Sequence, residues 1–291
     1  MKYSWDNYAY EDEFVYPFVE TREEQIEQLR SDVISGYRTK TIRSGNMLEC
    51  EIYPIYRKRV GISRAPRRRK TPANQRGLNE RNAQKHFVRL INANFTRKDI
   101  WVTVTYADKN MPESEEDAER NIQRYIRRLE YQVKKKNLPS LKYVYITEYN
   151  DDDEDHIRVH HHIVMNFRDR DLAEEKWDGG SRTQARRLQP DEDFSLSGLG
   201  FYLAKDPKGR KRWKASKNLT QPIITVSDGK ITKGGAIKIA REGFCARARF
   251  ERLYRGYEFR DLQASVSDLF SGVYIHVRMR RKEIKGESRR R

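Results

Sequence analysis

Cysteine is scarce in this sequence, and long apolar runs are absent from it. The two cysteines among its 291 residues, Cys50 and Cys245, lie far apart and in no spacing typical of metal ligands. This excludes a disulfide-built scaffold and a thiolate zinc site. No apolar run is long enough to cross a membrane, and the first residues lack the basic and then apolar order of a signal peptide. We therefore expect a cytoplasmic protein that does not act at a membrane.

Acidic residues are too few to balance the basic ones. The sequence has 60 lysines and arginines against 43 aspartates and glutamates, which gives a formal net charge of +17 and an isoelectric point near 9.8. Such an excess indicates a polyanionic partner, and nucleic acid is the first candidate.

One basic segment, YRKRVGISRAPRRRK, runs from residue 56 to residue 70 around glycine and proline. This composition favours an exposed loop or arm over a buried element. A solvated tail or a localisation signal would have the same composition, but the charge of the whole chain favours contact with a DNA backbone. The residues expected to make this contact are Arg57, Lys58, Arg59, Arg67, Arg68, Arg69 and Lys70.

The middle of the chain has the pattern of a folded core. Residues Ile100 to Tyr106 alternate in polarity and predict a strand, and Glu113 to Lys136 predict an amphipathic helix. Leu141 to Tyr149 and Ile157 to Asn166 flank an acidic turn and predict an antiparallel hairpin. Strand, helix, strand, strand is half of a ferredoxin-like fold. We therefore expect an α+β protein with a ferredoxin-like (RRM-like) antiparallel sheet and helices on one face.

Later segments are expected to complete this fold. Helical patterns recur at Leu196 to Lys205 and Ala236 to Tyr254, and strand-like patterns at Pro222 to Val226 and Val273 to Val277. The predicted domains are an N-terminal extension with the basic arm (1–98), a main domain with C-terminal helical and strand additions (99–279), and a basic, disordered tail (280–291).

Histidine is concentrated in one place. Four of the six histidines fall in HIRVHHH, residues 156 to 162. Because side chains alternate across a strand, His160 and His162 share one face, whereas His161 joins Ile163 on the other. His156 shares the face of His160 but lies farther along, so we expect it to be an accessory residue only.

A carboxylate is expected beside the two imidazoles. Glu148 ends the mostly apolar run VYITE, and a hairpin centred near Glu154 would place it directly opposite His160. Two histidines and one carboxylate with open coordination positions suit a divalent metal used in catalysis. Partly exposed histidines satisfied by hydrogen bonds are the alternative, but a same-face pair with an adjacent carboxylate favours the metal.

A short helix downstream presents a tyrosine. In SLSGLGFYLAKD, Leu196, Leu199, Gly200 and Leu203 form the buried stripe, and Tyr202 and Lys205 fall outside it, with space for a phosphate over Gly198. A free phenol has a pKa of about 10 and is a poor nucleophile at neutral pH unless a cation stabilises its anion. Lys205 and the metal would both do so. With 17 tyrosines in the chain, this motif gains weight only beside the histidine strand.

A basic segment with an aromatic ring follows this helix. Interleaved charge and ring suit single-stranded DNA, whose backbone binds cations and whose bases stack on aromatics. The alternative is a solvated loop with Trp213 packed inward. The residues expected to contact DNA are Arg210, Lys211, Arg212, Trp213, Lys214 and Lys217.

The order of these motifs resembles the HUH endonucleases. The VTVTY strand, the strand ending in Glu148, the element at His160 to His162 and Tyr202-Leu-Ala-Lys205 follow one another as in that family. More closely, GFYLAKDPKGRKRWKASKNLTQP looks like the rolling-circle replication-associated proteins of bacterial phages and plasmids. The similarity runs from about Ile100 to Pro222, and it departs from the family at His161, where a hydrophobic residue is usual.

The resemblance implies an HUH nuclease core in which Glu148, His160 and His162 hold Mg2+ or Mn2+. Tyr202 would attack a phosphodiester of single-stranded origin DNA, which forms a 5'-phosphotyrosine and frees a 3'-OH that primes synthesis. A tyrosine after the histidines is typical of replication initiators and single-tyrosine transposases. Positions 198 and 206 are Gly and Asp, so we expect a one-tyrosine enzyme.

The chain lacks the GxxxxGK[ST] motif of a fused helicase, so a host helicase and polymerase are expected partners, in the cytoplasm of a bacterial host. Three alternatives to a replication initiator stay open. They are a single-tyrosine HUH transposase, a noncatalytic nucleic-acid-binding module and a metal-dependent hydrolase that uses water.

Overall fold

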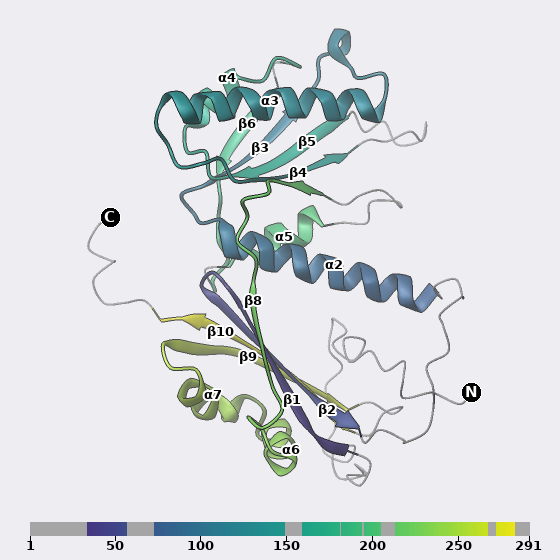
Figure 1. Cartoon of the computed structure of the whole chain (residues 1–291), viewed down its shortest axis with the longest axis vertical. Helices are drawn as coiled ribbons and strands as arrows, with labels where there is room; N and C mark the ends of the chain where they lie inside the picture. The colour runs from purple at the N-terminus through teal and green to yellow at the C-terminus, as the bar shows by residue number, and fades with distance from the viewer. Residues whose placement is uncertain are drawn as a thin grey trace. The chain divides into compact units, whose positions relative to one another are not determined.

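A computed structural model gives the structure of the chain (Figure 1). It divides into two compact units, one of residues 84–221 and the other of residues 1–83 together with 222–291. The residues that the structure describes are 34–56, 73–148, 159–180, 182–193, 195–204, 213–266 and 272–282.

The unit of residues 84–221 is built on one antiparallel sheet with the strand order β6-β3-β5-β4-β7. In chain order, β3, α3, β4, β5, α4 and β6 form the βαββαβ arrangement of a ferredoxin-like fold. The elements are β3 (Ile100–Thr105), α3 (Glu115–Lys135), β4 (Tyr143–Glu148), β5 (His160–Met165), α4 (Arg170–Glu175), β6 (Thr183–Arg187) and β7 (Lys214–Ala215). The predicted α+β fold class with an antiparallel sheet is confirmed.

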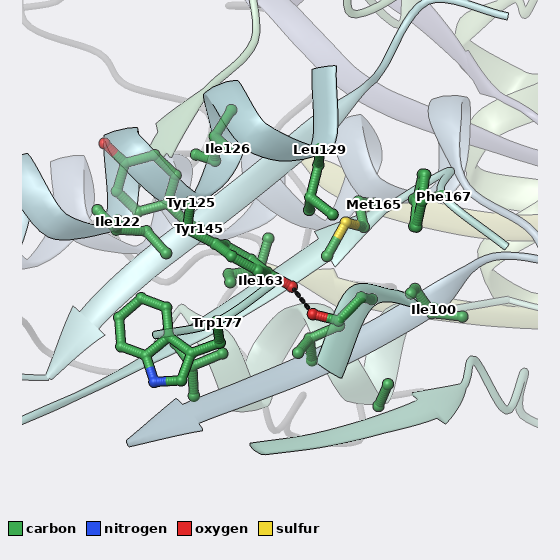
Figure 2. Close-up of a cluster of buried hydrophobic side chains, with 14 of the residues drawn as sticks. Ile100, Ile122, Tyr125, Ile126, Leu129, Tyr145, Ile163, Met165, Phe167 and Trp177 are labelled. Atoms are coloured by element: carbon green, nitrogen blue, oxygen red, sulfur yellow. Dashed lines mark hydrogen bonds between the residues drawn. The ribbon is translucent and has the colours of Figure 1, made fainter. Parts of the chain in front are cut away.

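Helix α3 covers one face of this sheet. The Ser114 hydroxyl accepts a hydrogen bond from the backbone N–H of Asp117, and acidic residues in the first turn with lysines in the last complement the helix dipole. Figure 2 shows Ile122 and Leu129 of α3 in the same buried cluster as Ile163 and Met165 of β5. The main core of the unit therefore lies between α3 and the sheet.

The other face of the sheet is partly covered by two further helices. They are the second half of α2 (Ala73–Asn94) and the short α5 (Ser197–Leu203), which lie across the sheet from α3 in Figure 1. Phe87 and Ile91 of α2 pack with Leu203 of α5 against Val144 and Val164 of the sheet. This face therefore has helices over one part and leaves the ends of β4 and β5 for the candidate site.

The second unit contains another antiparallel sheet, with the order β8-β1-β2-β10-β9. A hairpin turn at Gly45, which has a positive φ of 59°, joins β1 to β2. Helices α6 and α7 pack on one face of this sheet. The elements are β1 (Ile34–Ser44), β2 (Met47–Tyr56), β8 (Ile223–Ser227), α6 (Lys233–Glu242), α7 (Arg247–Leu253), β9 (Tyr257–Val266) and β10 (Val273–Arg281).

The segments that complete the ferredoxin-like fold are not the expected ones. The predicted strands at 222–226 and 273–277 exist as β8 and β10, but they pair with β1 and β2 in the second sheet. The ferredoxin-like sheet is completed instead by α4 and β6. Strands β1 and β2 offer the later strands a hydrogen-bonded partner with a matching apolar face, so the compact units differ from the domains predicted at 1–98, 99–279 and 280–291.

Candidate metal and tyrosine site

Strand β5 places its three histidines as the alternation predicts. His161 is fully buried with Ile163 and Met165 in the core under α3, whereas His160 is half-buried on the opposite face. The rings of His160 and His162 have centroids 4.8 Å apart, nearly perpendicular to each other. Two imidazoles therefore point together, away from the α3 core.

The carboxylate of Glu148 lies between these two rings. Glu148 pairs directly with His160 in the register of β4 and β5, as predicted. Its Oε2 atom lies 3.2 Å from Nε2 of His160, and its Oε1 atom lies 3.7 Å from Nε2 of His162. One ligand atom from each residue lies within 4.8 Å of the other two, a spacing that suits a single bound cation.

Strand β3 orients His162. Thr103 is the cross-strand partner of His162, and its Oγ1 atom lies 3.0 Å from Nδ1 of the ring. A hydrogen bond at Nδ1 fixes the ring and leaves Nε2 directed toward Glu148, which is the arrangement expected of a metal-binding histidine. Sequence reasoning did not identify Thr103, although the alternation of VTVTY places it on the same face as the two histidines.

His161 has the opposite environment. Its Nε2 atom lies 2.7 Å from the Tyr106 hydroxyl and its Nδ1 atom 2.8 Å from the Thr147 hydroxyl. Burial lowers the pKa of His161 to about 3, so the ring is neutral at physiological pH. A neutral, doubly hydrogen-bonded ring inside the core is a structural group, and it stands where a hydrophobic residue was expected.

Tyr202 lies on the face that carries the two metal-site histidines. Its ring centroid is 6.2 Å from that of His162 and 5.8 Å from that of Trp101, a residue of β3. The side chain keeps 44% of its surface exposed. Helix α5 therefore presents a solvent-accessible phenol beside the imidazole pair, and the neighbouring Phe201 is also exposed.

Contacts to α2 hold α5 at both of its ends. At the start, the Asn92 side chain accepts a hydrogen bond from the backbone N–H of Leu196 (2.7 Å). At the end, the Gln84 amide donates to the carbonyl of Ala204 (2.9 Å). Between them, a Cβ added to Gly200 would lie 2.8 Å from Val88, so the glycine permits close packing of the two helices. The two amides and this glycine set the position of Tyr202, and of the three only Gly200 had a sequence signal.

Several residues predicted to bind DNA lie outside the described residues. The rest of the set has defined contacts. The Trp213 ring packs on Phe87 at 4.6 Å, and Nζ of Lys214 lies 2.8 Å from the Glu119 carboxylate, while Lys217 is exposed. Trp213 is therefore packed inward and partly buried, as in the alternative interpretation of this segment. The residues outside the described ranges are Arg57, Lys58, Arg59, Arg67, Arg68, Arg69, Lys70, Lys205, Arg210, Lys211 and Arg212.

A second group of acidic and histidine side chains lies in the other unit. Glu49, Glu51 and His276 have ligand atoms within 4.8 Å of one another. The Nζ atom of Lys40 lies 3.4 Å from a carboxylate oxygen of Glu51, so a cation of the chain already offsets charge there. The group near Glu148 is the better candidate for a metal because the tyrosine lies beside it.

A comparison with protein families supports this location. Residues 99–216 match a family model for replication-associated proteins of the ORF2 type. The matched segment begins at β3 and ends at β7, so it contains Glu148, the histidine strand and Tyr202. The match supports a replication-associated protein with a role in replication initiation.

No curated protein and no solved structure matches the chain. Among the described residues, no helix is both long and apolar enough to cross a membrane.

Proposed function

We propose that the protein starts rolling-circle replication by nicking single-stranded origin DNA with Tyr202 as the nucleophile. The observation that carries this proposal is the position of an exposed phenol on α5, 6.2 Å in ring separation from His162, whose Nε2 faces Glu148. The match of residues 99–216 to replication-associated proteins supports the same function.

The residues of the metal group suit a hard divalent cation. Glu148 supplies carboxylate oxygens at a 41% exposed position, and His160 and His162 supply nitrogen ligands on one side of it. Mg2+ or Mn2+ held there would draw electron density from a nonbridging phosphate oxygen and offset its charge. The exposed carboxylate leaves room for a phosphate next to the ligands.

Tyr202 would carry out the covalent step. Its phenolic oxygen would attack the phosphorus, the bond from phosphorus to the 3' oxygen would break, and the 3' oxygen would take up a proton to become a 3'-OH. The tyrosyl ester retains the 5' phosphate, which conserves the bond for later rejoining. Packing against Trp101 and the two amide contacts to α2 would hold the phenol in place for this attack.

A replication initiator and a single-tyrosine transposase would share this chemistry. The family that matches residues 99–216 is replication-associated, which favours the initiator. Since a one-tyrosine enzyme has no second phenol one turn away, the later strand transfer would need another nucleophile or a second subunit.

Incubation with single-stranded, origin-like oligonucleotides and Mn2+ tests the proposal. The wild-type protein should form a covalent adduct that survives a denaturing gel, and Tyr202→Phe should not. The Phe variant keeps the ring that contacts Trp101 and His162, so it removes only the nucleophilic oxygen.

The other outcomes identify the alternatives. Cleavage without an adduct would indicate a hydrolase that uses water. Binding without cleavage at any Mn2+ concentration would indicate a noncatalytic binding module.

A further inference from the structure

Strand β6 is a basic edge strand that the proposed chemistry does not use. It has the sequence TQARR and lies at one end of the sheet order, paired with β3 alone among the described strands. Its side chains are exposed at Gln184, Arg186 and Arg187. A central ladder partner on one side and exposed cations on the other make it a candidate for binding an anion.

The register places two of these side chains on the metal face. Gln184 pairs with Thr103, which contacts His162, and Arg186 pairs with Trp101, which packs on Tyr202. Directly paired residues have Cβ atoms about 5 Å apart on the same face. Gln184 and Arg186 therefore lie one strand beyond the residues that orient the metal ligand and the nucleophile.

Neither side chain has a partner within the described parts of the chain. No hydrogen bond or ion pair there involves the amide of Gln184 or the guanidinium of Arg186. Arg187 differs, because it pairs with Ile100 on the core-facing side and its guanidinium donates to the carbonyl of Lys98 (2.6 Å). The guanidinium of Arg186 is thus available to a ligand, whereas that of Arg187 has a structural contact.

We propose that Arg186 and Gln184 bind the backbone of the single-stranded DNA next to the phosphate that Tyr202 attacks. The strand would pass from the Glu148 group across β3 to the edge at β6. This inference rests on the proposed function, since it takes the same DNA strand as its ligand. A planar guanidinium gives two parallel hydrogen bonds to a phosphate, and a side-chain amide adds a neutral donor to the phosphate or sugar.

The test measures DNA affinity without cleavage. Fluorescence anisotropy of a fluorescein-labelled oligodeoxynucleotide of mixed sequence is recorded in EDTA with the full chain at several NaCl concentrations. Arg186→Gln should weaken binding about tenfold, the order of one charge-assisted hydrogen bond. It should also reduce the slope of log K against log salt by about 0.7, the value for one phosphate contact on a single strand. Gln184→Ala should weaken binding without a change in slope, because the amide is uncharged.

Arg127→Gln is the matched control. Arg127 is exposed on α3, which covers the opposite face of the same sheet, and the substitution changes the net charge equally. Its affinity and salt slope should stay close to those of the wild type. Thermal unfolding by circular dichroism should give similar midpoints for the three variants, since each changes an exposed side chain.

The result that would overturn the inference is an Arg186→Gln variant with the same affinity and slope as Arg127→Gln. The Tyr202 adduct assay, run on the same samples with Mn2+ and saturating oligonucleotide, separates this failure from failure of the proposed function. An adduct with unchanged DNA affinity in Arg186→Gln would reject the β6 contact alone. Reduced affinity in Arg186→Gln without an adduct in the wild type would reject the nicking reaction and support the β6 contact.

Discussion

Replacing His161 with alanine should destabilise the protein and leave its metal affinity intact. The ring is fully buried and both of its nitrogens make hydrogen bonds, to Tyr106 and Thr147. Removal of a buried side chain of this size typically costs about 2 to 5 kcal/mol, and each lost hydrogen bond about 0.5 to 1.5 kcal/mol. Because Thr147 is only half-buried and can turn to water, we expect a total near the lower end, about 3 kcal/mol.

The matched comparison is His160→Ala, the next residue along β5. His160 is half-buried and lies on the other face of the strand, so its loss should change the free energy of unfolding by less than about 1 kcal/mol. It should, however, abolish Mn2+ binding, because it removes one of three ligands. The two neighbouring substitutions are thus expected to have opposite effects on stability and on metal affinity.

Two measurements on the same samples decide between these effects. Urea unfolding followed by tryptophan fluorescence reports on the interior, since the Trp177 ring lies 6.0 Å from that of His161. Titration calorimetry with Mn2+, at a temperature where both variants are folded, gives the metal affinity. If His161→Ala lost Mn2+ binding at unchanged stability, the assignment of faces on β5 would be refuted.

Three further predictions follow from individual contacts. Gly200→Ala should displace α5 and reduce adduct formation at unchanged Mn2+ affinity, whereas Gly198→Ala, where an added Cβ meets nothing within 4 Å, should not lower the unfolding midpoint in a thermal melt. Glu148→Gln should weaken Mn2+ binding at least tenfold in calorimetry, because an amide brings no charge to the ion; an unchanged affinity would remove Glu148 from the ligand set. Burial raises the pKa of the Cys50 thiol to about 12, so iodoacetamide at neutral pH should modify the exposed Cys245 and reach Cys50 only after unfolding, as peptide mass spectrometry would show.

Local rules predicted the centre of the site correctly. The period of two along β5 assigned the faces of His160, His161 and His162, and the turn centre near Glu154 placed Glu148 opposite His160. Both are short-range properties of a hairpin, so they follow from sequence spacing alone.

The elements around the site depended on longer-range contacts and were missed. Helix α2 lacks acidic residues in its first turn and basic ones in its last, and its apolar side chains become a stripe only against the sheet and α5. Strand β6 reads as polar because its outer side chains are exposed, and its place in the sheet comes from pairing with β3, about 80 residues earlier.

The second sheet had a local signal that the sequence reasoning did not use. Gly45 and Asn46 separate two alternating segments, which is the pattern of a two-residue hairpin, and the structure has β1 and β2 there. What the hairpin could not reveal is its partner strand β10, which pairs with β2 from the far end of the chain. Pairing across such a separation leaves no trace in neighbouring residues.

The run of three consecutive histidines makes the fold sensitive to the pairing frame of β5. Moving β5 by one residue against its neighbours would turn one imidazole outward instead of two, and would bring two imidazoles into an interior that has hydroxyl partners for a single ring. The same error would expose Ile163 and Met165. A misaligned strand would therefore lose its cation and its apolar contacts together, so the interior histidine helps to select the alignment in which the outer two can bind metal.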